Sequence, residues 1–437
     1  APAPAEPLPV RLAAADAARP QDWWDGIFGG PRMAWDLVGR GDEDALLLLV
    51  NGGDEAGLDL EAIPLLAPQQ EIAVVERFLD PDTVAWLRDY RFSGDIDGYR
   101  EGELYFPGSP ILTVRAPFAE GVLLETLILS ILNHDSAVAS AASRMTGAAG
   151  TRPCIEMGSR RTHDEAAVAS ARAAYIAGFA STSNLEAGRR YGIPTQGTAA
   201  HAFTLLHDDE REAFEAQVAA FGPGTTLLVD TYDVEQGVRT AVEVAGPQLG
   251  GVRIDSGDLV VLAGEVREQL DSLGATDTKI VVTSDLDEYA IAALAAAPVD
   301  GYGVGTRVVT GSGAPTAGMV YKLVARADDE GRMIGVAKKS KDKQSIGGRK
   351  YALRRMNANG VAEQELLGIG ELPHNDGNDV ELLVELVRDG EVVGRDRCTA
   401  EAARAHHERS VGQLPRSAHQ LSRGTPAVET IFLTETP

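Results

Sequence analysis

The hydrophobic pattern is most regular between residues 222 and 309, where short apolar runs alternate with segments of helical spacing. Four runs pass from apolar residues into acidic or small polar ones: TTLLVDTYD (225–233), GVRIDSGD (251–258), KIVVTSDLD (279–287) and GYGVGTRVV (301–309). Unbroken apolar runs that end in turn residues are typical of strands buried on both faces. Their strict alternation with helices predicts parallel β/α units.

The polar residues that follow the four strands are the first candidates for a functional site. Carboxyl ends of parallel strands gather at one rim, and the active sites of β/α proteins lie there. Carboxylates and hydroxyls suit a polyol phosphate and its Mg²⁺. The alternative is that these residues only cap helices and close turns, where Asp, Ser and Gly are common. The predicted rim residues are Asp230, Asp233, Asp255, Ser256, Asp258, Ser284, Asp285, Gly305 and Thr306.

Outside this stretch the pattern predicts other elements. Residues 94–117 alternate polar and apolar positions between Gly and Pro turns, which is typical of antiparallel strands. Residues 118–145 have the apolar stripe of a long helix, and a break near Asn133 is left open. A hairpin over 381–393 follows, and residues 399–423 have the pattern of an amphipathic helix that ends in a turn. We therefore predict a β/α barrel domain of residues 118–335, and a second domain of residues 1–117 completed by residues 336–437.

Composition narrows the class of protein. The formal net charge of −25 disfavours binding to a nucleic-acid backbone. We find no apolar run long enough to cross a bilayer and no signal-peptide pattern at the start of the sequence. The two cysteines, Cys154 and Cys398, fit a reducing compartment and cannot form a zinc cluster by themselves. We therefore expect a cytoplasmic protein with neither nucleic acid nor membrane as a partner. The acidic composition does not exclude small phosphorylated ligands, because these need only a few local cations.

Two side chains near the predicted rim are candidates for ligand binding or catalysis. Arg253 lies inside an apolar strand, where a charge is costly unless paired, and Asp255 projects to the same side. The pair is either a buried structural ion pair or a guanidinium oriented toward a ligand carboxylate or phosphate. His201, in GTAAHAF, is either structural or catalytic. Because the histidines show no paired spacing, no protein-bound metal centre is predicted.

Taken together, several segments resemble the nicotinate phosphoribosyltransferase family, especially its actinobacterial branch. EMGSRRTH, STSNLEAG, GTAAHAFTLLH, LLVDTYD, GVRIDSGDL, VVTSDLDEYAIAAL and YGVGTRVVTGSG occur in the order and spacing of that family, and the resemblance covers roughly residues 71–430. It implies an α/β fold: an irregular β/α barrel of the type II phosphoribosyltransferase kind, with a second α/β domain formed by both chain ends. It also implies a homodimer with active sites completed across the interface. Residues 1–70 depart from the family, because its Thr-Asp-x-Tyr-x-x-Thr-Met block and Arg-Arg-x-Pro segment are missing.

The resemblance also implies roles for single residues. His201 matches the histidine that ATP phosphorylates. Met157, Arg160 and Arg253 match positions around the pyridine ring and its carboxylate, and Ser183 stands where the related nicotinamide enzymes carry an aspartate. Further matches are acids around the ribose and Mg²⁺ (Asp230, Asp255, Asp285) and the 5′-phosphate loop (Gly305, Thr306). The expected catalytic residues are His201, Asp255 and Asp230, and the expected substrate-binding residues are Met157, Arg160, Ser183, Arg253, Ser284, Asp285, Gly305 and Thr306.

The reaction implied by the resemblance joins nicotinate to phosphoribosyl pyrophosphate in NAD salvage. It yields nicotinate mononucleotide and pyrophosphate, with ATP as co-substrate. Mg²⁺ would arrive on the substrate pyrophosphate, and Asp230 is a candidate ligand. One alternative is a quinolinate phosphoribosyltransferase, which shares the barrel and needs neither ATP nor the histidine. The other is an impaired, non-catalytic homologue, because of the unusual N-terminal sequence.

Overall fold

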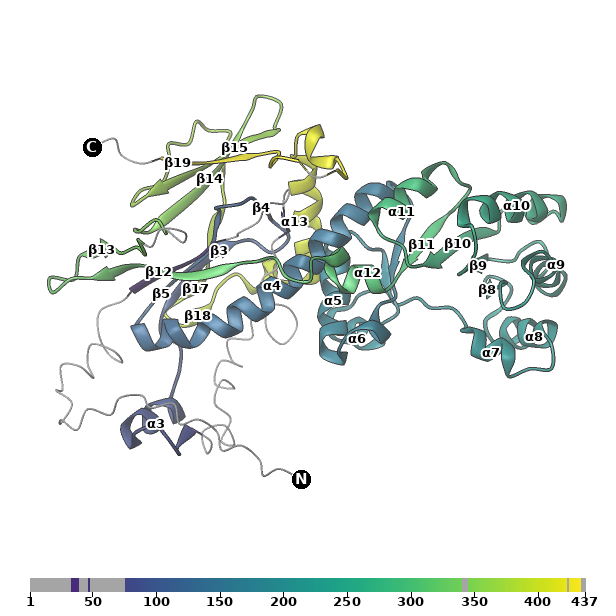
Figure 1. Ribbon diagram of the computed structural model, residues 1–437, viewed down its shortest axis with the longest axis horizontal. Coiled ribbons are helices and arrows are strands. Elements are labelled where there is room, and N and C mark those ends of the chain that lie inside the picture. The colour runs from purple at the N-terminus through teal and green to yellow at the C-terminus, as the bar shows by residue number, and fades with distance from the viewer. Residues whose placement is uncertain (1–32, 39–45, 48–74, 340–344, 423, 434–437) are drawn as a thin grey trace, which may run out of the picture.

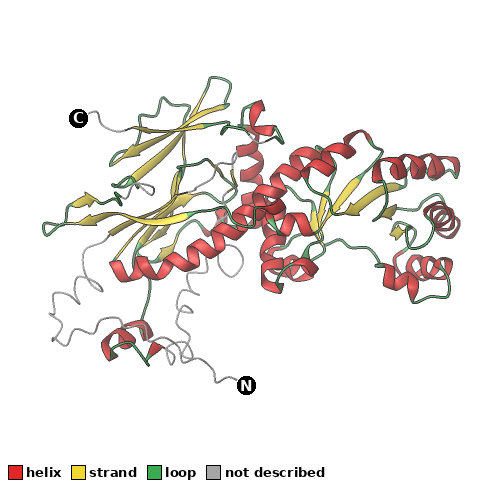
Figure 2. Cartoon of the chain, in the orientation of Figure 1, coloured by secondary structure: helices red, strands yellow, loops and turns green. Residues whose placement is uncertain are grey.

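The computed structural model describes residues 33–38, 46–47, 75–339, 345–422 and 424–433. Within them the chain forms two bodies that lie side by side along the long axis of the molecule (Figure 1). Helices surround the sheet of one body, whereas strands dominate the other (Figure 2). The departure from the family pattern over residues 1–70 lies outside the described residues, apart from the short segments 33–38 and 46–47.

A six-stranded parallel sheet forms the first body and confirms the predicted β/α units. The strand order is β7, β6, β11, β10, β9, β8, and each neighbouring pair is parallel. In the described residues the edge strands β7 and β8 do not pair with each other, so the barrel-like unit is an open half-barrel. The strands are β6 (Cys154–Glu156), β7 (Ser181–Thr182), β8 (Thr226–Leu228), β9 (Gly251–Ile254), β10 (Lys279–Ser284) and β11 (Gly301–Val304). The helices are α5 (Asp164–Ile176), α6 (Leu185–Tyr191), α7 (His201–Leu205), α8 (Glu210–Phe221), α9 (Val234–Ala245), α10 (Leu259–Ser272), α11 (Glu288–Ala293) and α12 (Thr306–Val309).

The second body is built from segments near both ends of the chain, as predicted. Its seven-stranded sheet has the order β13, β12, β1, β5, β3, β17, β18. These strands are β1 (Met33–Val38), β3 (Asp95–Tyr99), β5 (Pro110–Ala116), β12 (Val320–Ala327), β13 (Met333–Gly335), β17 (Leu383–Arg388) and β18 (Glu391–Val392). A four-stranded sheet, β16 (Val380–Glu381), β14 (Lys350–Met356), β15 (Ala362–Ile369) and β19 (Glu429–Leu433), and the pair β2 (Leu46–Leu47) and β4 (Leu104–Tyr105) complete it. The helices here are α3 (Pro81–Arg88) and α13 (Ala400–Gly412), and turns follow α13, in agreement with the predicted amphipathic helix that ends in a turn.

The sheets divide the chain differently from the predicted boundaries 118 and 335. Strand β12 pairs with β1, and β13 pairs with β12, so residues 320–335 belong to the antiparallel sheet. The sequence pattern did not show that β12 and β13 pair within the antiparallel sheet, because the apolar pattern of a strand does not identify the sheet to which it belongs. The predicted hairpin at 381–393 is present as β17 and β18, with Asp389 and Gly390 in the left-handed conformation that a two-residue turn requires.

Helix α4 (Phe118–Ala149) joins the two bodies. Its first half packs Leu124 and Ile128 into the core of the antiparallel body, and its second half packs Val138 and Met145 into the core of the parallel one. The helix runs unbroken through Asn133, whose side chain accepts a hydrogen bond from the backbone just before β12 at a distance of 2.8 Å. The break left open near this residue is therefore absent.

The length and composition of α4 also suit a membrane span, which the sequence analysis did not anticipate. It has 32 residues, and its most apolar window has a mean hydropathy of 1.3. Its apolar side chains, however, fill both hydrophobic cores, and Asp135 on the same helix is buried. The apolar composition of α4 is therefore that of a helix buried between two hydrophobic cores.

Buried ion pairs tie the C-terminal segment to the strands before α4. Arg354 on β14 is 1 % exposed and donates to Glu103 over 2.6 Å and to Glu365 over 2.7 Å. The other oxygen of Glu103 lies 2.8 Å from Nε2 of His406 on α13. Because both carboxylates are buried, their charge depends on the guanidinium between them.

We expect Arg354→Ala to lower the free energy of unfolding by about 3–5 kcal/mol, since it removes the guanidinium shared by two buried carboxyl groups and leaves Glu103 with only His406 as an ion-pair partner among the described contacts. The midpoint of urea denaturation measures this change. Arg189→Ala is the control, because Arg189 pairs with Glu186 on the surface at 72 % exposure and such a pair contributes about 1 kcal/mol or less. Equal midpoints for the two variants would contradict the structural role of Arg354.

Candidate active site

The carboxyl ends of the six parallel strands bring the predicted site residues to one rim. Met157 follows β6, Ser183 follows β7, Asp230 comes two residues after β8, Asp255 follows β9, and Gly305 follows β11. Because all neighbouring pairs are parallel, these positions share one edge of the sheet. Ser284, the last residue of β10, and Asp285 after it are both exposed there.

The structure separates the acidic residues of this rim into two groups. Asp233, Asp258 and Asp287 are the N-caps of α9, α10 and α11, and their side chains accept hydrogen bonds from backbone N–H groups of the first turn. For these three the capping alternative holds. Asp230 and Asp255 cap no helix. They instead lie against His201, the first residue of α7.

His201 sits between hydroxyl and carboxylate groups. Its Nδ1 lies 3.2 Å from Oγ1 of Thr231, and its Nε2 lies 3.9 Å from Oδ1 of Asp230 and 3.7 Å from Oδ2 of Asp255. The imidazole is 41 % exposed, whereas the Asp230 side chain is 1 % exposed. One face of the ring is thus open to a ligand while one nitrogen faces two carboxylates. This arrangement suits a nucleophile or a proton carrier.

Asp230 is held through only one of its oxygens. Its Oδ2 accepts from the backbone N of Asp255 over 2.9 Å and from Oγ of Ser256 over 2.7 Å. Its Oδ1 is buried and has no hydrogen-bond partner among the described residues. A buried, unpaired carboxylate oxygen is uncommon in a folded protein, and it is suited to a ligand or a proton.

Arg253 is joined to three neighbours. Its Nε donates to Thr283 and its Nη1 to Thr198, each over 2.8 Å, and its Nη2 lies 3.0 Å from Oδ1 of Asp255. The predicted pairing with Asp255 is therefore present. A guanidinium has five N–H donors, so one N–H remains on each terminal nitrogen. Two such donors form the fork that binds a carboxylate in two parallel bonds, so the structural and the ligand-binding interpretations of Arg253 are compatible.

The pKa of Asp255 reflects opposing effects. Burial acts to raise the pKa, but the hydrogen bond from Thr283 and the positive charge of Arg253 outweigh it and hold the pKa below the ordinary value. Asp255 is therefore a stable carboxylate at neutral pH. It places a negative charge 3.7 Å from Nε2 of His201.

The strand β6 contributes a residue that the sequence analysis did not single out. Glu156, just before Met157, is fully buried and accepts hydrogen bonds from Oγ1 of Thr182 and from the backbone N of Gly158. Burial raises the pKa of this carboxyl. Ser183 donates its backbone N–H to the carbonyl of Glu156 over 2.8 Å. A carboxylate within the short apolar run CIE was the signal that could have identified it.

Close backbone contacts fix the loop after β11. A methyl group added to Gly158 would overlap the side chain of Val309 and lie 3.0 Å from the carbonyl oxygen of Gly305. One added to Gly303 would overlap the side chain of Thr283. Only glycine leaves room for these approaches. Gly305 and the start of α12 therefore lie directly beside the β6 loop.

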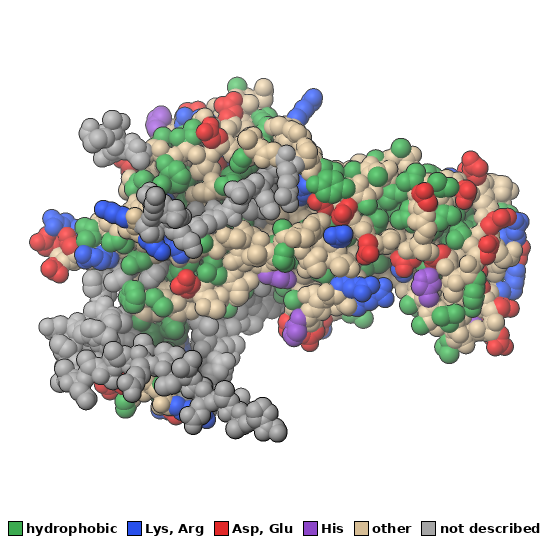
Figure 3. Space-filling model, viewed as in Figure 1, with side chains coloured by type: hydrophobic (Ala, Val, Ile, Leu, Met, Phe, Trp, Pro, Cys, Tyr) green, Lys and Arg blue, Asp and Glu red, His purple; other side chains and the backbone are tan. Residues whose placement is uncertain are grey.

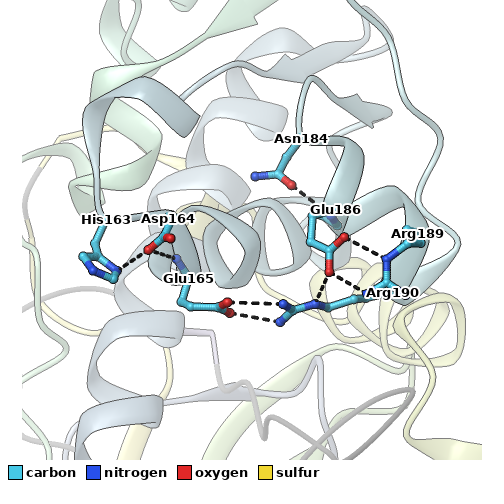
Figure 4. Close-up of polar contacts among 8 residues, drawn as sticks. His163, Asp164, Glu165, Asn184, Glu186, Arg189 and Arg190 are labelled. Atoms are coloured by element: carbon cyan, nitrogen blue, oxygen red, sulfur yellow. Dashed lines mark hydrogen bonds and ion pairs between the residues drawn. The ribbon is translucent and has the colours of Figure 1, made fainter.

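An ion-pair cluster supports the loops that carry Arg160 and Ser183. Arg190 on α6 makes two bonds to Glu165 on α5, of 2.9 and 3.2 Å, and one of 2.7 Å to Glu186 (Figure 4). Asn184 caps α6 and donates to Ser159 over 3.0 Å. These contacts hold the start of α5, the Ser159–Arg161 turn and the start of α6 together.

Basic side chains are locally available despite the acidic composition. Arg160 and Arg161 in the turn after β6, like Arg189 and Arg190 on α6, are exposed. The space-filling view shows Lys and Arg side chains in a compact group near the middle of the visible face, while acidic groups spread along the far end of the parallel body (Figure 3). Anionic ligands therefore need not meet a uniformly negative surface.

The sequence predicts no protein-bound metal centre, and the side chains of the described structure can be compared with that prediction. Within the part of the chain that the structure describes, no group of three His, Cys, Asp or Glu side chains is placed to hold a metal ion. The unpaired Oδ1 of Asp230 fits a single carboxylate ligand. A divalent cation with most of its ligands from a bound pyrophosphate would be compatible with this donor set.

Known proteins resemble this chain over most of its length. Residues 67–133 match the nicotinate phosphoribosyltransferase (NAPRTase) N-terminal domain. The nicotinate phosphoribosyltransferase pncB1 of Mycobacterium tuberculosis is 58 % identical over 85 % of this chain and 84 % of its own length. The nicotinate phosphoribosyltransferase of Bacillus subtilis is 39 % identical over 66 % of this chain and 59 % of its own length.

Solved structures show the same fold. The human nicotinic acid phosphoribosyltransferase superposes with a TM-score of 0.76 and 24 % identity, covering 94 % of this chain and 95 % of that one. The nicotinate-nucleotide pyrophosphorylase of Pyrococcus furiosus gives a TM-score of 0.69 with 21 % identity, covering 88 % and 90 %. The M. tuberculosis relative, at 58 % identity over most of both chains, establishes that this chain belongs to the nicotinate phosphoribosyltransferase family.

Proposed function

We propose that this protein transfers the phosphoribosyl group of phosphoribosyl pyrophosphate to nicotinate, forming nicotinate mononucleotide and pyrophosphate in NAD salvage. The observation that carries the proposal is the convergence of His201, Asp230, Asp255 and Arg253 at one rim of the parallel sheet. The relatives that bear the name nicotinate phosphoribosyltransferase support it.

The proposed reaction is a displacement at C1 of the ribose. The ring nitrogen of nicotinate forms the new bond to C1 as the bond from C1 to the pyrophosphate oxygen breaks, and positive charge develops on the ribose ring. Asp255, held as a carboxylate by Arg253 and Thr283, supplies negative charge at the rim. Preorganised charge of this kind stabilises a transition state without reorganisation. Mg²⁺ bound through the pyrophosphate, with Asp230 as a candidate ligand, would neutralise the leaving group.

Arg253 is the proposed anchor for the carboxylate of nicotinate. Its contacts with Thr198, Thr283 and Asp255 fix the guanidinium plane and leave one donor on each terminal nitrogen. A planar fork held by three neighbours loses little side-chain entropy when it binds. The anchor is therefore ready before the substrate arrives.

The loops after β6 and β7 are the proposed surroundings of the pyridine ring. Met157 and Arg160 belong to the loop after β6, and Ser183 is the neutral residue after β7. The backbone bond from Ser183 to Glu156 keeps the two loops adjacent. The remaining rim positions are proposed to contact the ribose and the 5′-phosphate: Ser284, Asp285, Gly305 and Thr306.

ATP coupling is the further part of the proposal, and it rests on His201. A neutral imidazole with Nδ1–H directed at Thr231 keeps the lone pair of Nε2 between Asp230 and Asp255. Attack of Nε2 on the γ-phosphorus forms an N–P bond and releases ADP, and the two carboxylates offset the positive charge that the ring acquires. Hydrolysis of the phosphohistidine then returns the imidazole.

The alternatives from the sequence gain no specific support from the site. The quinolinate type was raised because it shares the barrel and needs neither ATP nor the histidine, whereas His201 lies between Asp230 and Asp255 at the rim. An impaired homologue was suggested by residues 1–70, whereas the rim residues lie together in the described structure. A homodimer completed across its interface and a cytoplasmic location stay part of the proposal. The free thiols of Cys154 and Cys398 agree with a reducing compartment.

We expect Arg253→Ala to lower kcat/KM for nicotinate by about tenfold or more, because a charge-assisted, two-bond contact typically contributes about 1.5–3 kcal/mol. Steady-state kinetics with nicotinate and with nicotinamide measure the effect. Arg239→Ala on α9 is the control, since Arg239 pairs only with Glu235 on the surface in the described contacts. An equal loss with both pyridines would argue against carboxylate recognition by Arg253.

Ser183→Asp tests the selectivity for the anionic substrate. A carboxylate placed beside the pyridine site repels nicotinate, so its kcat/KM should fall by roughly tenfold or more while that of nicotinamide falls less or rises. Ser183→Asn is the matched control of nearly equal size without charge. If both variants change the two substrates in parallel, Ser183 does not lie close to the ring carboxylate.

His201→Ala tests the coupling to ATP. The variant should incorporate no acid-labile phosphate from γ-labelled ATP and lose stimulation by ATP, while ATP-independent synthesis survives in weakened form. His207→Ala is the control, since His207 bonds to the carbonyl of Phe203 and packs on its ring. Persistent phosphorylation of His201→Ala would refute the phosphohistidine assignment and favour a reaction without ATP.

A further inference from the structure

Glu156, at the end of β6, is a buried carboxyl group that the proposed mechanism does not use. It is fully buried, and the two groups that donate to it are neutral. The backbone N–H of Gly158 bonds to Oε1, and the hydroxyl of Thr182 bonds to Oε2. Gly158 belongs to the loop after β6, whereas Thr182 is the last residue of β7. One carboxyl group therefore joins two neighbouring strand ends through both of its oxygens.

The carboxyl of Glu156 lies on the face of the sheet that is turned away from the rim side chains. Thr283, which bonds to Arg253 at the rim, pairs with Gly303, and Gly303 pairs with Ile155. Paired residues of parallel strands point to the same face, and consecutive residues of one strand point to opposite faces. Glu156 follows Ile155 and therefore supports the strand ends from behind. Its position is that of a positioning residue rather than of a group that touches the substrate.

Further hydrogen bonds close a ring between the loops after β6 and β7. Oγ1 of Thr182 accepts from the backbone N of Asn184 over 3.0 Å, and the side chain of Asn184 donates to Oγ of Ser159 over 3.0 Å. The backbone N of Ser183 donates to the carbonyl of Glu156 over 2.8 Å. Because Ser159 belongs to the loop after β6, the contacts that begin at Glu156 return to the loop from which they started.

These two loops carry the residues that are proposed to surround the pyridine ring. Met157 and Arg160 lie in the loop after β6, and Ser183 lies in the loop after β7. The side chain of Met157 packs against β11, where a methyl group added to Gly303 would lie 2.9 Å from its sulfur. The contacts of Glu156 therefore determine how far Met157 and Ser183 lie from each other.

We propose that Glu156 is a positioning residue for the pyridine site: its bonds to Gly158 and Thr182 set the spacing of the two loops that flank the ring. The inference rests on the proposed function, which places nicotinate between these loops. A gap of a fraction of an ångström already forfeits much of the dispersion attraction between a ring and its neighbours. Loss of the Glu156 contacts should therefore weaken the use of nicotinate more than that of phosphoribosyl pyrophosphate, whose proposed contacts follow other strands.

The first test compares Thr182→Val with Thr182→Ser. Valine keeps the shape of threonine but removes the hydroxyl, so Glu156 and Asn184 each lose a partner. In steady-state kinetics the KM for nicotinate should rise by about tenfold, and the KM for phosphoribosyl pyrophosphate by less than about twofold. Thr182→Ser keeps the hydroxyl and should stay within about threefold of the wild type for both substrates. An unchanged KM for nicotinate in Thr182→Val would overturn the proposal.

Thr278→Val is the matched control for a general loss of stability. Thr278 is buried just before β10, at the amino end of the sheet, and its hydroxyl donates to the carbonyl of Leu249 over 2.9 Å. Its replacement should lower Tm as Thr182→Val does, because each removes a buried hydrogen bond. Both KM values should nevertheless stay at the wild-type level. A rise in the KM for nicotinate equal to that of Thr182→Val would show that destabilisation alone is responsible, and the proposal would be wrong.

The second test changes Glu156 itself. In Glu156→Gln the amide oxygen can accept from Gly158 and the amide NH₂ can donate to Oγ1 of Thr182, so both contacts persist without the negative charge. This variant should keep the KM for nicotinate within about threefold of the wild type, whereas Glu156→Ala should raise it by about tenfold or more. If Glu156→Gln is as impaired as Glu156→Ala, the charge rather than the spacing of the loops is required, which contradicts the proposal.

Amide hydrogen exchange tests the same inference without catalysis. In Glu156→Ala the amides of residues 157–161 and 183–184 should exchange about tenfold faster or more, while those of α9 and α10 keep the wild-type rates. Thr182→Val gives the same comparison if Glu156→Ala does not fold. If the wild type does not convert nicotinate, the proposed function fails, and exchange still reports whether Glu156 orders the two loops. Faster exchange throughout the chain, or none in these loops, would refute the positioning role.

Discussion

The hydrogen-bonded ion pair of Arg253 and Asp255 is the contact on which the rim depends. Arg253 lies within β9, bonds to Thr283 on β10 and reaches Thr198 in the segment before α7. Asp255 accepts from Thr283 and, through its backbone, donates to Asp230 beyond β8. One pair of charges therefore links three neighbouring strands and the segment that carries His201. A guanidinium that is only 11 % exposed would be costly without Asp255, so the fold and the site are stabilised by the same contact.

The second constraint is the rigid connection between the two bodies. Helix α4 contributes to both hydrophobic cores, and β12 returns the chain from the parallel sheet to the antiparallel one beside β1. Arg354 on β14 then fastens the C-terminal strands to the segment before α4 through Glu103, and it pairs with Glu365 on the neighbouring strand β15. Because these contacts are buried, the rim is built on a scaffold with few degrees of freedom, as positioning and electrostatic catalysis require.

The acidic residues at the strand ends show how alike structural and functional positions look along a chain. Asp233, Asp258 and Asp287 bind the first turns of the helices that follow them. Asp230 and Asp255 also come after apolar strands, but their contacts are with each other and with His201. The difference lies in whether a side chain meets its own helix or a neighbouring strand, and only the packing of the strands decides that.

The sequence by itself determined the α/β class, the parallel β/α units and the rim on which the site residues lie, because apolar periodicity and residue type are local properties. The i+2 spacing also predicted the contact of Arg253 with Asp255. Tertiary structure alone decided that the half-barrel is open, that β12 belongs to the other sheet and that α4 is unbroken. It also revealed Glu156, whose significance comes from burial beside Thr182, a residue distant in the chain. A buried carboxyl and a solvated one are the same letter in a sequence, and only the surroundings set the free energy of their charge.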